Sequence, residues 1–170
     1  MKHEKTILIM RHAKSSWDDS SLRDFDRPLN KRGRRDAPAM GRYLSDLDLV
    51  PDYVVSSPAK RAKETVELVS KAIGADLPSV NFDEDLYYDG VEAYIEAIRS
   101  APKESGIVLV AGHNPTIEQA VAKLSGGNTG LQKITTANIA CFYSSASQWE
   151  DVSELNTTFK WLMGPKDIQE

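Results

Sequence analysis

Runs of apolar residues alternate with polar segments along the chain, and their spacing predicts the secondary structure. Residues 5–10 form a continuous apolar run with Ile and Leu, which predicts a strand buried on both faces. The runs at 52–57 and 106–112 predict two more strands, and the latter is the clearest in the chain. Residues 11–29 are polar and predict a loop. The pattern of residues 79–88 does not decide whether they contain a short strand.

Helical spacing of apolar residues follows these strands. The segment 29–47 contains Asn30, which suits an N-cap, but Pro38 predicts a kink or a restart within the helix. Further helical patterns cover 58–74, 90–101 and 114–126. In the helix at 58–74, we expect Pro58 or Ala59 in the first turn and Gly74 after the end. In the helix at 114–126, we expect Asn114 as N-cap and Pro115 as the first helical residue.

Two strands at 137–144 and 151–163, joined by the turn-prone residues 145–150, complete the pattern. The alternation of strand and helix predicts an α/β fold, a three-layer sandwich whose mostly parallel central sheet has helices on both faces. We expect the two C-terminal strands to pair antiparallel. Ligands of such sheets bind beyond the carboxyl ends of the strands, so candidate chemistry belongs there.

Composition narrows the class of protein. The chain has 170 residues, 41% hydrophobic and 27% charged, which fits a single folded domain over residues 1–170. No apolar run approaches the roughly 20 residues that a membrane helix needs, so we expect no membrane association. The single cysteine, Cys141, excludes an intramolecular disulfide and lies in an apolar run typical of a buried thiol. Together these features favour a cytoplasmic protein, and they leave the number of subunits open.

Charge is unevenly distributed along the chain. The net charge is −4, which argues against non-specific binding of nucleic acid. Residues 23–42 are nevertheless rich in Arg and Lys, and residues 83–96 are rich in Asp and Glu. A local basic zone on an acidic protein suits a small anionic ligand or an acidic patch on a partner.

Polar residues stand at three predicted strand ends. The first strand ends in Arg11 and His12, and the strand at 106–112 is followed by His113. Arg61 lies in a first helical turn, where a cation is unfavourable against the helix dipole unless an anion lies in front of it. Each residue alone is more often structural. Four of them at neighbouring strand ends predict one shared pocket.

Two arginines and two histidines are suited to phosphoryl chemistry. Arginine forks match phosphate oxygens and stay charged. A histidine with one unprotonated nitrogen can take a phosphoryl group while its other nitrogen donates to a fixed acceptor. A second, protonated histidine can bind a phosphoryl oxygen. This chemistry needs no metal, and the sequence contains neither a common metal-binding motif nor a P-loop, so we expect no metal and no cofactor.

Three motifs resemble those of a known family. The segments RHAKSSW, SSPAKRAKET and GHNP, in this order within residues 5–115, resemble the motifs of the histidine phosphatase superfamily, the phosphoglycerate-mutase-like proteins. The segment FDRPLNKRGRRDA and the short chain resemble its small bacterial branch, the phosphohistidine phosphatases. The resemblance implies a metal-independent phosphatase that acts through a phosphohistidine intermediate.

The resemblance also implies roles for matching residues. His12 would be the nucleophile, and Arg11, Arg61 and His113 would hold the phosphoryl group. Asn114 would assist in substrate binding through its backbone or its side chain.

Arg27 matches an arginine that the small branch places near the pocket. Its alternative role is an ion pair with Asp24 or Asp26 that stabilises the loop. The part played by Lys14 and by the basic loop at 23–35 is left open.

The sequence departs from the larger relatives of the superfamily at two points. They carry glycine and threonine where this chain has Ala13 and Ser15, and Ser15 keeps a hydroxyl for substrate binding. They also use an acidic residue to protonate the leaving group. The candidates here are Glu84, Asp85 and Asp18, and their alternative role is a solvated loop. Lack of an acid would favour a leaving group that departs easily, such as the imidazole of phosphohistidine.

Several functions therefore stay open in order of preference. The first is a phosphatase acting on protein phosphohistidine, because the chain is compact and its basic loop looks exposed. The alternative is a phosphatase for small molecules, such as a sugar or nucleotide phosphate. A non-catalytic adaptor that binds phosphate, and then a mutase, rank lower.

Overall fold

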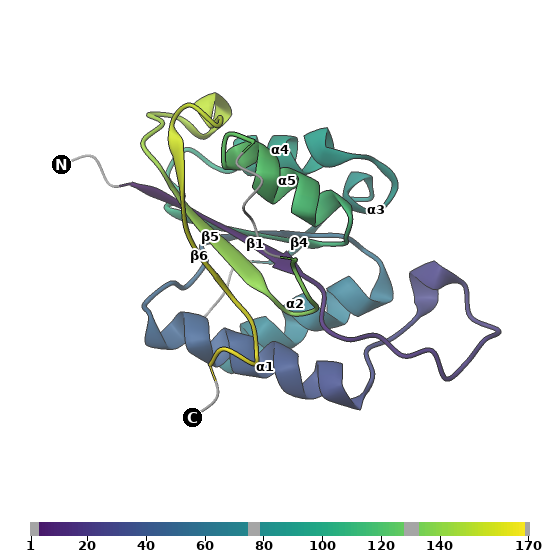
Figure 1. The fold of residues 1–170 in the computed structure, drawn as a ribbon. Helices are drawn as coiled ribbons and strands as arrows, with labels where there is room; N and C mark the ends of the chain where they lie inside the picture. The colour runs from purple at the N-terminus through teal and green to yellow at the C-terminus, as the bar shows by residue number, and fades with distance from the viewer. Residues whose placement is uncertain (1–3, 75–78, 128–132, 169–170) are drawn as a thin grey trace.

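The computed structural model describes residues 4–74, 79–127 and 133–168 of the chain. Helices surround a central sheet, and the segment between β1 and α1 projects from the body of the molecule (Figure 1). The elements are β1 (Lys5–Arg11), η1 (Asp24–Asp26), α1 (Lys31–Asp46), β2 (Tyr53–Ser56), α2 (Lys60–Ile73), β3 (Asn81–Phe82), α3 (Asp85–Tyr88), α4 (Val91–Arg99), β4 (Ile107–Gly112), α5 (Thr116–Leu124), β5 (Ile139–Ser144), η2 (Trp149–Asp151) and β6 (Thr157–Met163).

The described strands form one six-stranded sheet in the order β3-β2-β4-β1-β5-β6 (Figure 1). Strands β1 to β4 are parallel, whereas β5 pairs antiparallel with both β1 and β6. This arrangement confirms the predicted α/β fold with a mostly parallel sheet and antiparallel C-terminal strands. Because β1 lies beside β4, and β4 beside β2, the carboxyl ends of these three strands are neighbours at one edge. That the whole of residues 1–170 is one domain stays a prediction.

Helices cover both faces of the sheet. Helices α1 and α2 lie over one face, and α3, α4 and α5 lie over the other (Figure 1). Side chains along β1 point alternately to the two layers. Leu8 and Met10 join the apolar core beneath α1 and α2, while Ile7 and Ile9 join the core beneath α4 and α5. Burial on both faces explains why the strand sequences are continuous apolar runs.

Helix α1 begins as predicted, because the Asn30 side chain accepts a hydrogen bond from the Gly33 backbone N–H at 2.8 Å. A restart at Pro38 does not occur, and the helix runs through this residue. Proline removes one backbone hydrogen bond. Ala37 and Met40, buried on either side of it, hold the helix on the sheet and offset that loss.

Two predicted helix starts are wrong. Pro58 and Ala59 precede α2, with Ala59 as its N-cap, although Gly74 ends the helix in the left-handed conformation as expected. Asn114 does not cap α5, and Pro115 is the residue before the first helical one. The physical reason is that the Asn114 amide donates to Glu118 Oε1 and to a loop carbonyl, so it does not face the helix N–H groups.

The C-terminal hairpin also differs from its prediction. Strand β6 begins at Thr157, whereas residues 149–151 form the 3-10 turn η2. The buried Trp149 indole N–H donates to the Ser105 carbonyl at 2.8 Å and holds this turn against the body of the protein. The short strand left open within 79–88 is present as β3, and Cys141 is buried as expected. None of the helices in the described part of the chain has the length and apolar character needed to cross a bilayer.

Candidate active site

The central strands bring the predicted site residues to one edge of the sheet. Arg11, the last residue of β1, is in register with Gly112, the last residue of β4. His12 and His113 follow directly, and their ring centroids lie 5.2 Å apart. Arg61 reaches the same place from the first turn of α2, with its side chain almost fully buried.

The hydrogen bonds of His12 define its protonation. Its Nδ1 lies 2.7 Å from the Ala13 carbonyl oxygen, which only accepts, so Nδ1 carries the proton. Nε2 then presents its lone pair and lies 3.4 Å from Nε of Arg61. Burial, opposed in part by the Ala13 hydrogen bond, lowers the pKa of His12 to about 3, and the charges of His113, Arg61 and Arg11 add to this. The ring is therefore neutral at pH 7, with one unprotonated nitrogen that accepts a hydrogen bond from Arg61.

Thr65 fixes the backbone that holds His12, although the sequence gave no sign of a role for it at the site. Its hydroxyl accepts a hydrogen bond from the Ala13 N–H at 3.0 Å and donates to the Arg61 carbonyl at 2.6 Å. Thr65 is fully buried. One hydroxyl thus ties the segment after β1 to the first turn of α2, because it bonds to both.

His113 is held from both sides. Its backbone N–H donates to the Tyr94 hydroxyl at 3.0 Å, and its Nε2 lies 2.8 Å from the Ser57 hydroxyl. Only glycine at position 112 allows this approach, since a Cβ there would lie 2.0 Å from the Tyr94 hydroxyl oxygen. Burial, together with the charge of Arg61, lowers the pKa of His113 to about 3. His113 is therefore neutral here at pH 7, and the proton that we expected on it requires the negative charge of a bound anion.

Asp24, which the sequence suggested only as an ion-pair partner of Arg27, also contacts Arg61, and sequence reasoning missed this second contact. Its Oδ2 lies 2.9 Å from Nη2 of Arg61, and its carbonyl oxygen accepts from Nη1 of Arg61 at 2.7 Å. Despite its desolvation, hydrogen bonds from Tyr87, Arg61 and Arg27 lower the pKa of Asp24 to about 2. The Asp24 carboxylate thus already pairs with Arg61, one of the two arginines that we expected to bind phosphate. Its position three residues before Arg27 was the only available signal.

Arg27 makes the ion pair with Asp24 that the sequence left as an alternative, and it also bonds to Ser15. Its Nε and Nη2 donate to Asp24 Oδ1 at 3.2 and 3.1 Å, and its Nη1 donates to the Ser15 hydroxyl at 2.7 Å. Asp26 pairs with Arg23 instead. Arg27 is buried and joins Ser15, beside the nucleophile segment, to the network of Asp24 and Arg61.

Arg11 and Asn114 share one acceptor. Arg11 Nη1 and Asn114 Nδ2 both donate to the Ile134 carbonyl oxygen, at 3.0 and 2.8 Å. Within the described residues, three buried side-chain atoms lack a hydrogen-bond partner: Arg11 Nε, Asn114 Oδ1 and Nδ1 of His113. All three belong to residues at this edge. Buried polar atoms are normally satisfied, so their concentration here indicates a place for a polar ligand.

The three candidate acids lie apart from these contacts. Glu84, Asp85 and Asp18 are exposed, and no side-chain contact in the described part of the chain joins them to the two histidines or to Arg61. Helix α3 reaches the site through Tyr87 instead. The Tyr87 hydroxyl donates to Asp24 Oδ2 at 2.7 Å, and its ring centroid lies 5.4 Å from that of His113.

Arginines and helix N-termini at one sheet edge provide an anion site, and a neutral buried imidazole provides a nucleophile. The fold and the site together therefore define an α/β enzyme that handles phosphoryl groups. Among the described residues, no three His, Cys, Asp or Glu side chains cluster in a way that would hold a metal ion.

Comparison with known proteins agrees with this class. The family model of the histidine phosphatase superfamily (branch 1) matches residues 7–87. The phosphohistidine phosphatase SixA of Escherichia coli is 30% identical over 168 residues, which cover 96% of each chain. An uncharacterized chloroplastic protein of Arabidopsis thaliana is 33% identical over 94% of this chain and 75% of its own length. This chain belongs to the histidine phosphatase superfamily, and it is a phosphatase.

Solved structures agree with the fold. A protein from Nakamurella multipartitia that carries the SixA name superposes with a TM-score of 0.84 at 26% identity, over 96% of this chain and 98% of its own. A structure of the protein histidine phosphatase SixA complexed with tungstate gives a TM-score of 0.76 at 29% identity, over 96% and 99%.

Proposed function

We propose that this phosphatase hydrolyses phosphohistidine on proteins, without a metal ion, through a phosphoryl group carried transiently on His12. The observation that carries this proposal is the state of the His12 ring. Nδ1–H donates to the Ala13 carbonyl, and the unprotonated Nε2 accepts a long hydrogen bond of 3.4 Å from Nε–H of Arg61. A neutral imidazole with a pKa of about 3 is ready to act as a nucleophile at neutral pH.

The reaction divides into two displacements at phosphorus. In the first, the Nε2 lone pair of His12 attacks phosphorus, and the bond from phosphorus to the substrate imidazole breaks. That imidazole keeps the bonding electron pair and leaves neutral when its other ring nitrogen already carries a proton. In the second, water attacks phosphorus, the bond to Nε2 breaks, and its electron pair returns to His12. Both protons of the water end on the phosphate product.

The neighbouring residues would stabilise the charge that these steps develop. Arg11 and Arg61 would bind phosphoryl oxygens, and His113 would donate a proton to one of them once the anion has raised its pKa. Ser15 and Asn114 are placed for weaker substrate contacts. Asp24 would have to lose some of its hydrogen bonds with Arg61 when the phosphoryl group binds, because the two anions compete for the same guanidinium.

Phosphohistidine as the substrate is supported by the surroundings of His12. None of the three candidate acids contacts the two histidines. The protonated imidazole of phosphohistidine can leave without a general acid, whereas the alkoxide of a phosphate ester needs one. The relative SixA of E. coli is named a phosphohistidine phosphatase, and a SixA structure holds tungstate, a tetrahedral oxyanion like phosphate.

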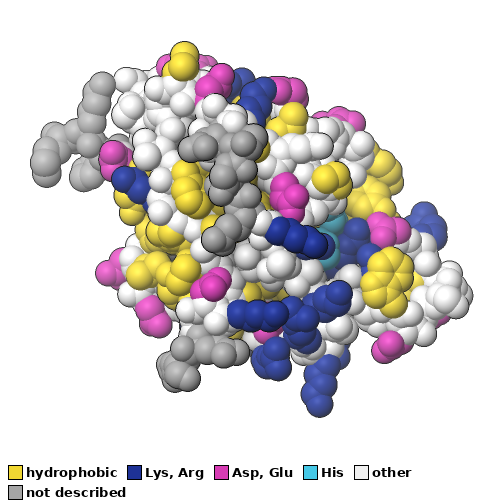
Figure 2. Space-filling view, in the orientation of Figure 1, with side chains coloured by type: hydrophobic (Ala, Val, Ile, Leu, Met, Phe, Trp, Pro, Cys, Tyr) yellow, Lys and Arg dark blue, Asp and Glu magenta, His cyan; other side chains and the backbone are white. Residues whose placement is uncertain are grey.

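A protein as the substrate is supported by exposed aromatic side chains beside the site. Trp17 is 71% exposed and stacks on the Arg27 guanidinium, and Tyr88 is 70% exposed and contacts Tyr87 edge to face. Figure 2 shows hydrophobic side chains next to the visible histidine. Exposed aromatics of this kind are common where one protein binds another. A cytoplasmic location and the absence of membrane and nucleic-acid partners stay predictions.

The test compares substrates of equal phosphate content. We expect kcat/KM to be highest for a phosphohistidine protein, lower for free phosphohistidine, and lowest for sugar and nucleotide monophosphates. We also expect EDTA to leave turnover unchanged, because arginine and histidine supply the charges that a metal would. A preference for a sugar or nucleotide phosphate would favour the alternative, a small-molecule phosphatase. Strong inactivation by EDTA would contradict the metal-independent mechanism.

A further inference from the structure

The first turns of α1 concentrate positive charge. Lys31, Arg32, Arg34 and Arg35 crowd the helix N-terminus, and no acidic residue lies in the first turn. The helix dipole favours anions at this end and disfavours cations. Contacts of Arg32 and Arg35 with Asp36, and of Arg34 with the Leu29 carbonyl, offset part of this cost, and an anionic partner would offset more of it.

A groove of about 790 Å³ runs beside this part of α1. One wall is α1, and the other consists of residues 133–138 and 164–168. Five cations and three carboxylates line it, and we call the surface formed by the cations the basic groove. They are Arg32, Arg35, Arg42, Lys133 and Lys166.

The carboxylates of the groove offset only part of this charge. Asp36 is buried and is shared by Arg32 and Arg35, at 3.4 and 3.2 Å. Asp167 accepts a hydrogen bond from a backbone N–H, and Asp46 is the third carboxylate of the lining. Within the part of the chain that the structure describes, no ion pair involves Arg42, Lys133 or Lys166. The groove therefore presents unpaired cations on a chain whose net charge is −4.

Backbone contacts join the basic groove to the active site. The Asn30 N–H donates to the Lys14 carbonyl at 2.9 Å, two residues after His12. On the opposite wall, the Arg11 N–H donates to the carbonyl of Asn138, which lines the groove, at 3.1 Å. Figure 2 shows Lys and Arg side chains gathered beside and below the histidine at the site. The groove wall that contains Asn138 is therefore bonded to Arg11, the residue next to His12.

We propose, resting on the phosphohistidine phosphatase activity above, that the basic groove binds an acidic segment of the protein substrate next to its phosphohistidine. Charge complementarity identifies the occupant, since several unpaired cations along a groove fit a run of Asp and Glu. The groove thus selects among phosphohistidine proteins, while the strand-end residues act on the phosphoryl group itself.

Two synthetic peptides of equal length test this directly. Each carries one phosphohistidine, flanked in one peptide by Asp and Glu and in the other by Lys and Arg. The variant Lys133→Glu/Lys166→Glu reverses two groove charges that make no ion pair in the described residues, so its folding is not at risk. We expect its kcat/KM on the acidic peptide to fall by about tenfold and its preference to shift toward the basic peptide. Turnover of free phosphohistidine should not change.

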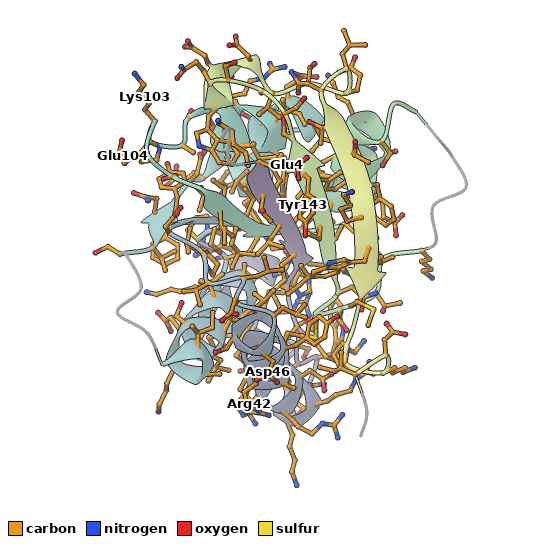
Figure 3. All side chains as sticks on the ribbon, turned by 90° about the vertical axis from the view of Figure 1, so that its left-hand side faces the viewer. Glu4, Arg42, Asp46, Lys103, Glu104 and Tyr143 are labelled. Atoms are coloured by element: carbon orange, nitrogen blue, oxygen red, sulfur yellow. The ribbon has the colours of Figure 1, made fainter. Side chains whose placement is uncertain are left out.

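The matched control is Lys71→Glu/Lys103→Glu, which makes the same change in net charge outside the groove. Figure 3 shows Lys103 at the opposite end of the molecule from Arg42. We expect this control to retain the preference of the unmodified protein for the acidic peptide. Equal losses in the two variants, or no preference in the unmodified protein, would overturn the inference.

Binding measurements separate this inference from the proposed function. Fluorescence anisotropy with the unphosphorylated acidic peptide reports on the groove even if no phosphohistidine compound is hydrolysed. The expected result is binding that weakens with salt and with Lys133→Glu/Lys166→Glu. Single-stranded DNA that binds as tightly, with the same sensitivity to these substitutions, would show a nucleic-acid surface and contradict the inference.

Discussion

At the scale of single residues, the two buried histidines couple folding to pH. An unfolded histidine takes up a proton near pH 6.5, whereas burial in the folded chain lowers the pKa of both His12 and His113 to about 3. Between these values the unfolded state binds more protons. The stabilising contribution is therefore complete above pH 6.5 and is lost as the pH falls toward 3.

We expect the free energy of unfolding to decrease from pH 7 to pH 5, by up to about 1.4 kcal/mol per pH unit for each histidine below pH 6.5. Urea unfolding at several pH values measures it. Asp24, whose pKa is lowered to about 2, also reduces the free energy of unfolding as the pH falls, but only below pH 4. It therefore does not affect the comparison between pH 7 and pH 5. The variant His12→Asn/His113→Asn should show a clearly flatter dependence. Equal pH dependence in the two proteins would contradict the burial of neutral rings.

Asp24 and a bound phosphate compete for the same arginine. The Asp24 carboxylate lies 2.9 Å from Nη2 of Arg61 and is half exposed. We expect Asp24→Asn to tighten the binding of inorganic phosphate or vanadate by a few-fold, on the order of what a partly exposed ion pair contributes. Isothermal titration calorimetry measures the change.

Asp26→Asn is the matched control, because Asp26 pairs with Arg23 and not with Arg61. It should leave oxyanion affinity unchanged. Weaker phosphate binding by Asp24→Asn would mean that Asp24 orients the arginines and does not compete with the ligand.

At the scale of elements, the position of α1 depends on one glycine. A Cβ on Gly33 would lie 2.2 Å from the Lys14 carbonyl oxygen, so only glycine lets the first turn of α1 pack on the segment that follows His12. We expect Gly33→Ala to cost about 1–3 kcal/mol of stability and to reduce kcat, because the helix and the nucleophile segment must separate. Denaturant unfolding and turnover of a model phosphate measure the two effects.

Gly90→Ala provides the comparison for that substitution, since a Cβ there meets nothing within 4 Å. Because Gly90 is the N-cap of α4, the substitution should cost at most about 1 kcal/mol of stability, and it should leave kcat unchanged. A Gly33→Ala protein with unchanged kcat would show that α1 does not position the nucleophile segment.

Elements with a strong apolar period were predictable from sequence, and their ends were less so. The buried strands follow from continuous apolar runs, and the helical faces follow from repeats of about 3.6 residues. Asn114 suits an N-cap by composition, but its amide turns to Glu118, a tertiary contact that no local pattern encodes. Pro38 is tolerated within α1 for a similar reason, because buried neighbours hold the helix.

At the scale of the whole molecule, the candidate site depends on the order of strands. Arg11, His12, Arg61 and His113 could be chosen from sequence because parallel strands place their carboxyl ends at one edge. The contact of Asp24 with Arg61 could not be predicted, since Asp24 lies in η1, between β1 and α1, and the position of this segment depends on tertiary contacts. Loop residues that act through tertiary contacts are thus the part of the site that sequence patterns miss.

The most direct test of the account is to find where the phosphoryl group goes. The protein is mixed with a phosphohistidine substrate, quenched in alkali within the first turnover, and mapped by mass spectrometry under conditions that preserve phosphohistidine. We predict one phosphorylated residue, His12, in the unmodified protein and none in His12→Asn, whose turnover should be lost. A phosphoryl group on another residue, or turnover retained by His12→Asn, would contradict the account.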